Sequence, residues 1–121
     1  MINLPLLKSI LEVEYSDIIV QINLTQINEA RLILIDDSFI EIWYSLELQN
    51  RFSIHWERKF IDGTIYRHDN IPHKKWINVT TFPKHFHNGS EYNVEESSIH
   101  ENIEIGVLQF LKFIREKIYK S

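Results

Sequence analysis

The chain has 121 residues, of which 44% are hydrophobic and 25% charged. This composition is typical of one globular domain spanning residues 1–121, and it excludes disordered and fibrous proteins. The chain has no cysteine, which excludes disulfides, iron–sulfur clusters and cysteine nucleophiles. No apolar run approaches the ~20 residues of a membrane span, and the N-terminus lacks the features of a secretory signal. The expected location is therefore the cytoplasm, with no membrane partner.

Positive charge is concentrated in the middle of a chain whose formal net charge is −4. Residues 51–87 carry seven Lys or Arg against three acids, together with five of the six histidines. A cationic, imidazole-rich patch on an acidic protein favours a compact anion such as a phosphodiester over a long nucleic acid.

An N-terminal helix and an antiparallel sheet are predicted. Asn3 is suited to cap a short helix that ends at Ser16-Asp17. Its expected buried stripe is Leu4, Leu7, Ile10 and Leu11. Alternating or apolar runs predict five strands, over residues 18–24, 31–35, 39–46, 52–61 and 64–69. A short sixth strand is compatible with residues 77–82.

The pair Asp62-Gly63 is typical of a two-residue hairpin, because glycine accepts the positive φ of a type I′ turn. This register places Arg58 opposite Arg67 and Trp56 opposite Asp69. Two facing arginines repel each other, which a bound anion would offset. The alternative is that both guanidinium groups point into water.

The regular spacing of apolar residues that marks helices and strands disappears over residues 70–93, which are rich in Pro, His and Lys. Long irregular segments in small domains are often functional. Ser98 to Glu101 has capping-box spacing and predicts the start of a final helix. Its apolar stripe is Ile103, Val107, Phe110, Leu111, Ile114 and Ile118. The predicted fold class is α+β: an N-terminal helix, an antiparallel β-meander of about five to six strands, and a C-terminal amphipathic helix packed on the sheet.

Two histidine-rich segments, 67–73 and 81–87, contain the candidate catalytic site. Imidazole exchanges protons near neutral pH, so two imidazoles beside a phosphodiester can act as general acid and general base. Cations neutralise the growing charge on phosphate, and a carboxylate orients an imidazole. The candidate catalytic residues are His73, His85, His87, Asp69 and Arg67. The candidate substrate-binding residues are Asn70, Lys84, Arg58, Lys74 and Trp76, the last by stacking on a base.

A metal site is the main alternative for the same histidines. His85 and His87 are two residues apart and share one face if the chain is extended, and His73 or Asp69 could complete a Zn²⁺ or Mn²⁺ site. The neighbouring lysines and arginines oppose a cation, so no metal and no cofactor is expected. The other three histidines are expected to be structural or exposed: His55, His68 and His100.

The segments 66–73 (Tyr-Arg-His-Asp-Asn-Ile-Pro-His) and 81–87 (Thr-Phe-Pro-Lys-His-Phe-His) resemble the TumE-like family of small prokaryotic toxin–antitoxin proteins. The family pattern runs from an aromatic/Arg strand into Asp-Asn-x-Pro-His, then Thr-Phe-Pro-His-His-x-His and a closing amphipathic helix. The resemblance covers essentially the whole chain. It departs at Lys84, where the family often has histidine, and at His68, where an aromatic or another residue is common. His85 and His87 therefore carry the match in the second segment.

The resemblance implies a small cytoplasmic protein, often encoded with an antitoxin, that attacks RNA. Small histidine-rich folds of this kind are also similar to the ring nucleases of type III CRISPR defence, which open cyclic oligoadenylates.

The function predicted from the sequence is a metal-independent phosphodiesterase acting on RNA or a small cyclic oligoadenylate. The 2′-hydroxyl would attack the adjacent phosphorus and leave a 2′,3′-cyclic phosphate. A non-catalytic nucleotide- or partner-binding defence module and a metal-dependent hydrolase are the alternatives. A homodimer is expected, because a meander with two short helices leaves one face of the sheet poorly covered.

Overall fold

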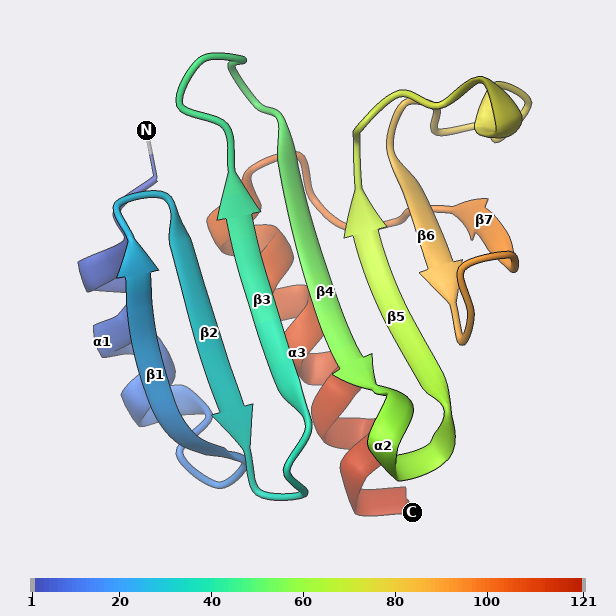
Figure 1. The fold of residues 1–121 in the computed structure, drawn as a ribbon. Helices are drawn as coiled ribbons and strands as arrows, with labels where there is room; N and C mark the ends of the chain where they lie inside the picture. The colour runs from blue at the N-terminus through green and yellow to red at the C-terminus, as the bar shows by residue number, and fades with distance from the viewer. Residues whose placement is uncertain (1, 121) are drawn as a thin grey trace.

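A single antiparallel sheet runs through the computed structural model, which describes residues 2–120. The elements are α1 (Leu4–Glu14), β1 (Ile19–Gln26), β2 (Glu29–Leu34), β3 (Phe39–Tyr44), β4 (Phe52–Arg58), α2 (Lys59–Asp62), β5 (Thr64–Asp69), the short 3-10 helix η1 (Lys74–Trp76), β6 (His85–Asn88), β7 (Val94–Glu96) and α3 (Ile103–Lys120). The seven strands lie side by side in chain order (Figure 1). The α+β prediction is confirmed, with slightly more strands than expected.

Both long helices lie on the same face of the sheet (Figure 1). Successive side chains of a strand point to opposite faces. In β4, Ile54 and Trp56 are buried against the helices, whereas His55 and Glu57 point the other way and stay partly exposed. The sheet thus has a helix-covered face and a second face, which we call the open face. The homodimer expected from such a face remains a prediction.

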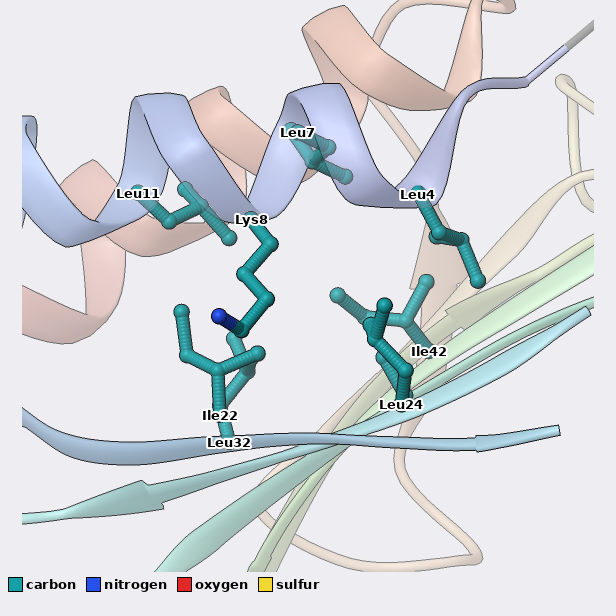
Figure 2. Close-up of a pocket in the computed structure, with 9 residues that line it drawn as sticks. Leu4, Leu7, Lys8, Leu11, Ile22, Leu24, Leu32 and Ile42 are labelled. Carbon is teal, nitrogen blue, oxygen red and sulfur yellow. The ribbon is translucent and has the colours of Figure 1, made fainter. Parts of the chain in front are cut away.

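The N-terminal helix starts as predicted, because the Asn3 side chain accepts a hydrogen bond from the Leu6 amide at 3.0 Å. Leu4, Leu7 and Leu11 are buried, but Ile10 is 37% exposed, so its place in the stripe was predicted wrongly. A helix turns 100° per residue, which places Ile10 beside Leu7 at the edge of the stripe and farthest from Leu4. A gap of about 10 Å³ remains between α1 and the first three strands (Figure 2). It has room for about one water molecule and marks imperfect packing.

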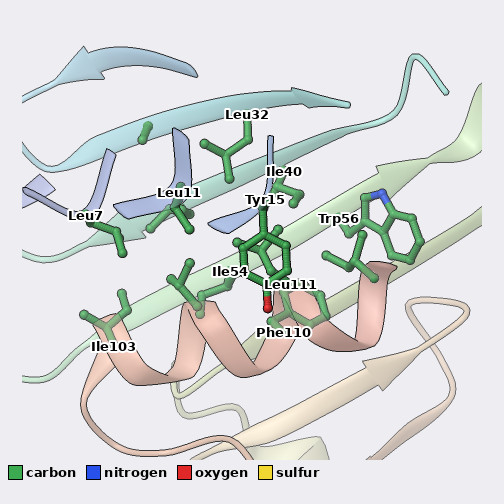
Figure 3. Packing of buried hydrophobic residues seen from close by; sticks show 14 of the residues in the cluster. Leu7, Leu11, Tyr15, Leu32, Ile40, Ile54, Trp56, Ile103, Phe110 and Leu111 are labelled. Carbon is green, nitrogen blue, oxygen red and sulfur yellow. The ribbon is translucent and has the colours of Figure 1, made fainter. Parts of the chain in front are cut away.

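The C-terminal helix packs its predicted stripe on the sheet. Ile103, Phe110 and Leu111 face the strands beside Tyr15 and the α1 leucines (Figure 3). The predicted start was wrong, because the helix begins at Ile103 and not at the capping box. The side chain of Asn102 caps it by accepting from the Ile105 amide at 3.1 Å. The preceding loop packs closely on the first turn of the helix, where the His100 carbonyl and the Ile99 side chain lie next to Gly106.

The turn between β4 and β5 also differs from the prediction. Residues 59–62 form the helical turn α2, which Gly63 ends with a φ of +78°, so the connection has five residues rather than two. Local hydrogen bonds stabilise it: Glu57 accepts from the Lys59 amide and Asp62 from the Thr64 amide. The register therefore shifts by three, and Arg58 pairs with Thr64 instead of Arg67.

The segment 77–82 is not a strand. The Val79 and Phe82 amides bond to the carbonyls three residues before them, which makes consecutive turns and leaves no ladder. The additional strands are β6 and β7, which extend the sheet beyond β5. This extension places two histidines beside the end of β5.

Candidate functional site

The pairing of β5 with β6 places one carboxylate and two imidazoles together on the open face. Asp69 lies opposite His85 and Arg67 lies opposite His87 in the antiparallel register. The Nε2 atom of His85 is 3.3 Å from Asp69 Oδ1, and the Nε2 atom of His87 is 3.8 Å from Asp69 Oδ2. We call these three residues the Asp69 centre. Asp69, His85 and His87 are only 4%, 2% and 3% exposed.

Backbone carbonyls hold both imidazoles in one orientation. The Nδ1 atom of His85 lies 2.9 Å from the Pro83 carbonyl oxygen, and that of His87 lies 3.0 Å from the Glu91 carbonyl oxygen. A carbonyl oxygen only accepts hydrogen bonds, so each Nδ1 carries the hydrogen. Both Nε2 atoms therefore face the carboxylate. Burial lowers the pKa of His87, and the charge of Arg67 lowers it further.

The carboxylate itself is held by two donors. The Ile71 amide donates to Asp69 Oδ1 at 2.9 Å, and Arg67 Nε donates to Asp69 Oδ2 at 3.1 Å. Asp69 is therefore positioned from its own strand and from the first residues after it. Its two oxygens remain directed toward different histidines.

Arg67 is engaged by acids rather than left free for a phosphate. It makes two hydrogen bonds to Glu91, at 2.8 and 2.7 Å, which raise the pKa of Arg67 and lower the pKa of Glu91 to about 2. A further N–H lies 3.2 Å from His55 Nδ1, and His55 Nε2 lies 3.1 Å from Glu57. A hydrogen-bonded chain thus runs from Glu57 to Asp69.

Glu91, His55 and Glu57 belong to this network and were missed by the sequence reasoning. A signal for two of them was present, since His55 and Glu57 share one face of a predicted strand with alternating burial. Glu91 gave no such signal, because it lies in the turn between β6 and β7 and reaches Arg67 only through the fold.

Trp76 covers the two imidazoles. Its ring centre lies 6.3 Å from that of His85 and 6.0 Å from that of His87. The His73 ring lies 6.1 Å from that of Trp76 and is exposed, while its Nδ1 caps η1 by accepting from the Lys75 amide. The structure therefore brings Trp76 to the Asp69 centre and leaves His73 at its margin.

A family model described as toxin TumE matches residues 7–118. The chain belongs to the TumE toxin family. The matched range contains the whole Asp69 centre and both histidine-rich segments, and family membership supports a toxin role. No curated protein and no solved structure matches the chain. Within residues 2–120, no helix is both long and apolar enough to cross a membrane.

Two cations expected at the site of this TumE-family chain lie elsewhere. Arg58 is buried on the helix-covered face, where it donates to Asp36 at 2.6 Å and Asp62 at 3.1 Å. The three-residue shift in the β4–β5 register moves it away from Arg67. The ammonium of Lys84 donates to the Ile99 carbonyl, beside the start of α3.

Two other residues predicted to bind substrate, Asn70 and Lys74, differ in whether their side chains are free to do so. Asn70 is occupied by the backbone of the β3–β4 connection: it accepts from the Phe52 amide at 2.9 Å and donates to the Asn50 carbonyl. Lys74 is exposed on η1, the short helix that carries Trp76. Of the two lysines predicted to bind substrate, Lys74 is therefore the one that lies near Trp76.

His68 is structural, as expected from its position on the opposite face to Asp69. It is buried, its ring stacks on Phe86 with centres 4.2 Å apart, and its Nδ1 lies 2.7 Å from the Ser97 hydroxyl. Burial lowers the pKa of His68 to about 3. His68 also lines a cavity of about 350 Å³ beside Phe110 and Phe113, which does not include the Asp69 centre.

Proposed function

We propose that this TumE-family toxin cleaves phosphodiester bonds in RNA at the Asp69 centre. The observation that carries the proposal is the pair of imidazole Nε2 atoms directed at one buried carboxylate. Such an arrangement supplies groups that accept and donate protons near neutral pH. A toxin role supports a reaction that damages the cell, and an antitoxin that blocks the open face is the expected partner.

The reaction we propose uses the nucleophile that RNA already contains. The 2′-oxygen forms a bond to the adjacent phosphorus while its proton passes to a base at the centre. The bond from phosphorus to the 5′-oxygen breaks, and that oxygen takes up a proton. The products are a 2′,3′-cyclic phosphate and a 5′-hydroxyl, with no water consumed.

Access to the centre requires Trp76 to move. His85 and His87 are almost fully buried, and the Trp76 ring lies beside both. Trp76 belongs to a three-residue 3-10 helix within the irregular segment that joins β5 to β6 (Figure 1). Once displaced, the indole can stack on a base next to the scissile phosphate, a contact worth ~1–3 kcal/mol.

The decisive experiment incubates single-stranded RNA and cyclic oligoadenylates with the wild-type protein and with H85Q and H87Q variants. Glutamine keeps a polar group near Nε2 but neither accepts nor donates a proton in catalysis, so each variant should lose at least about 100-fold in cleavage rate. The matched control is H100Q, since His100 is exposed and, within residues 2–120, its Nδ1 accepts only from the Asn102 amide. DNA of the same sequence should not be cleaved, because it lacks the 2′-hydroxyl.

Four outcomes would count against this proposal. Full activity in both H85Q and H87Q would remove the Asp69 centre from the reaction. Cleavage of the DNA control would exclude attack by the 2′-hydroxyl. Tight RNA binding with no product after long incubation would favour a binding module instead. Cleavage of cyclic oligoadenylate but not of linear RNA would reassign the substrate to the ring-nuclease class.

A further inference from the structure

We infer that Asp69, His85 and His87 bind one divalent transition-metal ion of the Zn²⁺ or Mn²⁺ type. The inference rests on the proposed function for its use of the same site, and it changes the role of the imidazoles. An Nε2 atom that binds a metal does not exchange protons, so His85 and His87 would hold the ion. The ion would stabilise the charge on the phosphate, in place of the metal-independent chemistry expected from the sequence. Metal binding is measured without RNA, so the metal site is tested separately from RNA cleavage.

The geometry of the three ligand atoms suits a single ion. Ligands about 2.1 Å from a tetrahedral metal lie roughly 3.4 Å from one another. The distances are 3.3 Å from His85 Nε2 to Asp69 Oδ1 and 3.8 Å from His87 Nε2 to the other carboxylate oxygen, Oδ2. One ligand atom from each residue can be chosen with all three within 4.8 Å of one another. Bringing the widest of these separations to the tetrahedral value requires a contraction of at most roughly 1.4 Å around an ion.

The hydrogen-bond partners of the imidazoles also match a metal site. Each Nδ1 hydrogen is given to a backbone carbonyl, so a neutral ring presents a lone pair at Nε2. Metal-binding histidines almost always donate their other N–H in this way. Without a proton or a cation between them, the lone pairs of His85 and His87 would face a negatively charged carboxylate and be repelled by it.

The charge around the centre favours a cation, contrary to the expectation from sequence. Among residues 2–120, the hydrogen-bonded network around the centre contains three carboxylates, Asp69, Glu91 and Glu57, and one guanidinium, Arg67. With neutral imidazoles its formal charge is −2. Lysine charges on η1 are exposed and therefore screened by solvent.

Two imidazoles and one carboxylate select among metals. Imidazole nitrogen suits Zn²⁺ and its neighbours in the first transition series, whereas Mg²⁺ and Ca²⁺ prefer sites made entirely of oxygen. Three protein ligands leave a position open for another group, as in catalytic zinc sites. An ion bound there would act as a Lewis acid on a phosphate oxygen.

The test measures binding of Zn²⁺, Mn²⁺ and Mg²⁺ to the chelator-treated full chain by calorimetry. We expect one Zn²⁺ per chain, weaker Mn²⁺ and no Mg²⁺ binding. The variants D69N and H87Q should lose at least about 100-fold in Zn²⁺ affinity, because each removes a direct ligand. The matched controls H73Q and H100Q should bind like the wild type, which separates the centre from surface histidines.

A second measurement uses only the wild-type chain, in case a variant does not fold. Nitrogen-15 spectra of the histidine rings should show Zn²⁺ shifting the Nε2 signals of His85 and His87 and no others. No stoichiometric binding by the wild type, or equal binding by D69N, H87Q and the controls, would overturn the inference. Metal binding without RNA cleavage would overturn the proposed function alone, and RNA cleavage by a chain that binds no metal would overturn the metal site alone.

Discussion

Lowering the pH from 7 to 5 should destabilise the wild-type protein more than an H68Q variant, by about 2 kcal/mol. The pKa of His68 is about 3 in the folded protein against 6.5 for the free side chain. Between these values the unfolded chain binds a proton that the folded chain excludes, so the free energy of unfolding falls as pH falls below 6.5. The loss approaches ~1.4 kcal/mol per pH unit and integrates to about 2 kcal/mol between pH 7 and pH 5.

The assay is urea denaturation of both proteins at the two pH values, followed by circular dichroism. The lower intrinsic stability of H68Q cancels, because only the change between pH 7 and pH 5 within each protein is compared. Glutamine retains a polar partner for Ser97, and the other titrating groups are common to both proteins. The H100Q variant serves as the exposed-histidine control and should behave like the wild type. Equal pH dependence in wild type and H68Q would refute the burial of a neutral His68.

Three further predictions test the placement of side chains. Arg58→Met should lower the free energy of unfolding by about 2–3 kcal/mol, since it removes the cation that is paired with Asp36 and Asp62, and should not change RNA cleavage per folded molecule; slower cleavage at unchanged urea stability would contradict this. Phe110→Ala should lower the free energy of unfolding by about 3–5 kcal/mol in the same denaturation assay, and a loss below ~1 kcal/mol would show that neighbouring side chains fill the cavity left by the ring. Lys84→Met should leave the KM for RNA unchanged, because the ammonium bonds to the Ile99 carbonyl; a raised KM would return Lys84 to the substrate.

The elements of this protein could largely be predicted because their signals are local. The stripe from Ile103 to Ile114 identifies α3, since a helix places every third or fourth residue on one face. The alternation of Phe52, Ile54 and Trp56 identifies β4 and its buried side by the same kind of argument. The spacing of His85 and His87 predicted that they share a face, which they do.

The composition of the site depended on contacts between distant segments. The β4–β5 register followed from side-chain hydrogen bonds that lengthen the turn, and a shift of three residues moved Arg58 to the other face. Likewise, only the pairing of β5 with β6 shows that Asp69 meets His85, and only the fold brings Glu91 to Arg67.

The sequence by itself therefore determined the layers of the protein and the presence of an imidazole-rich region. Tertiary structure decided the electrostatic character of that region, because charge at a site is set by which side chains approach within a few ångströms. Periodicity along one segment carries no information about such approaches across the sheet.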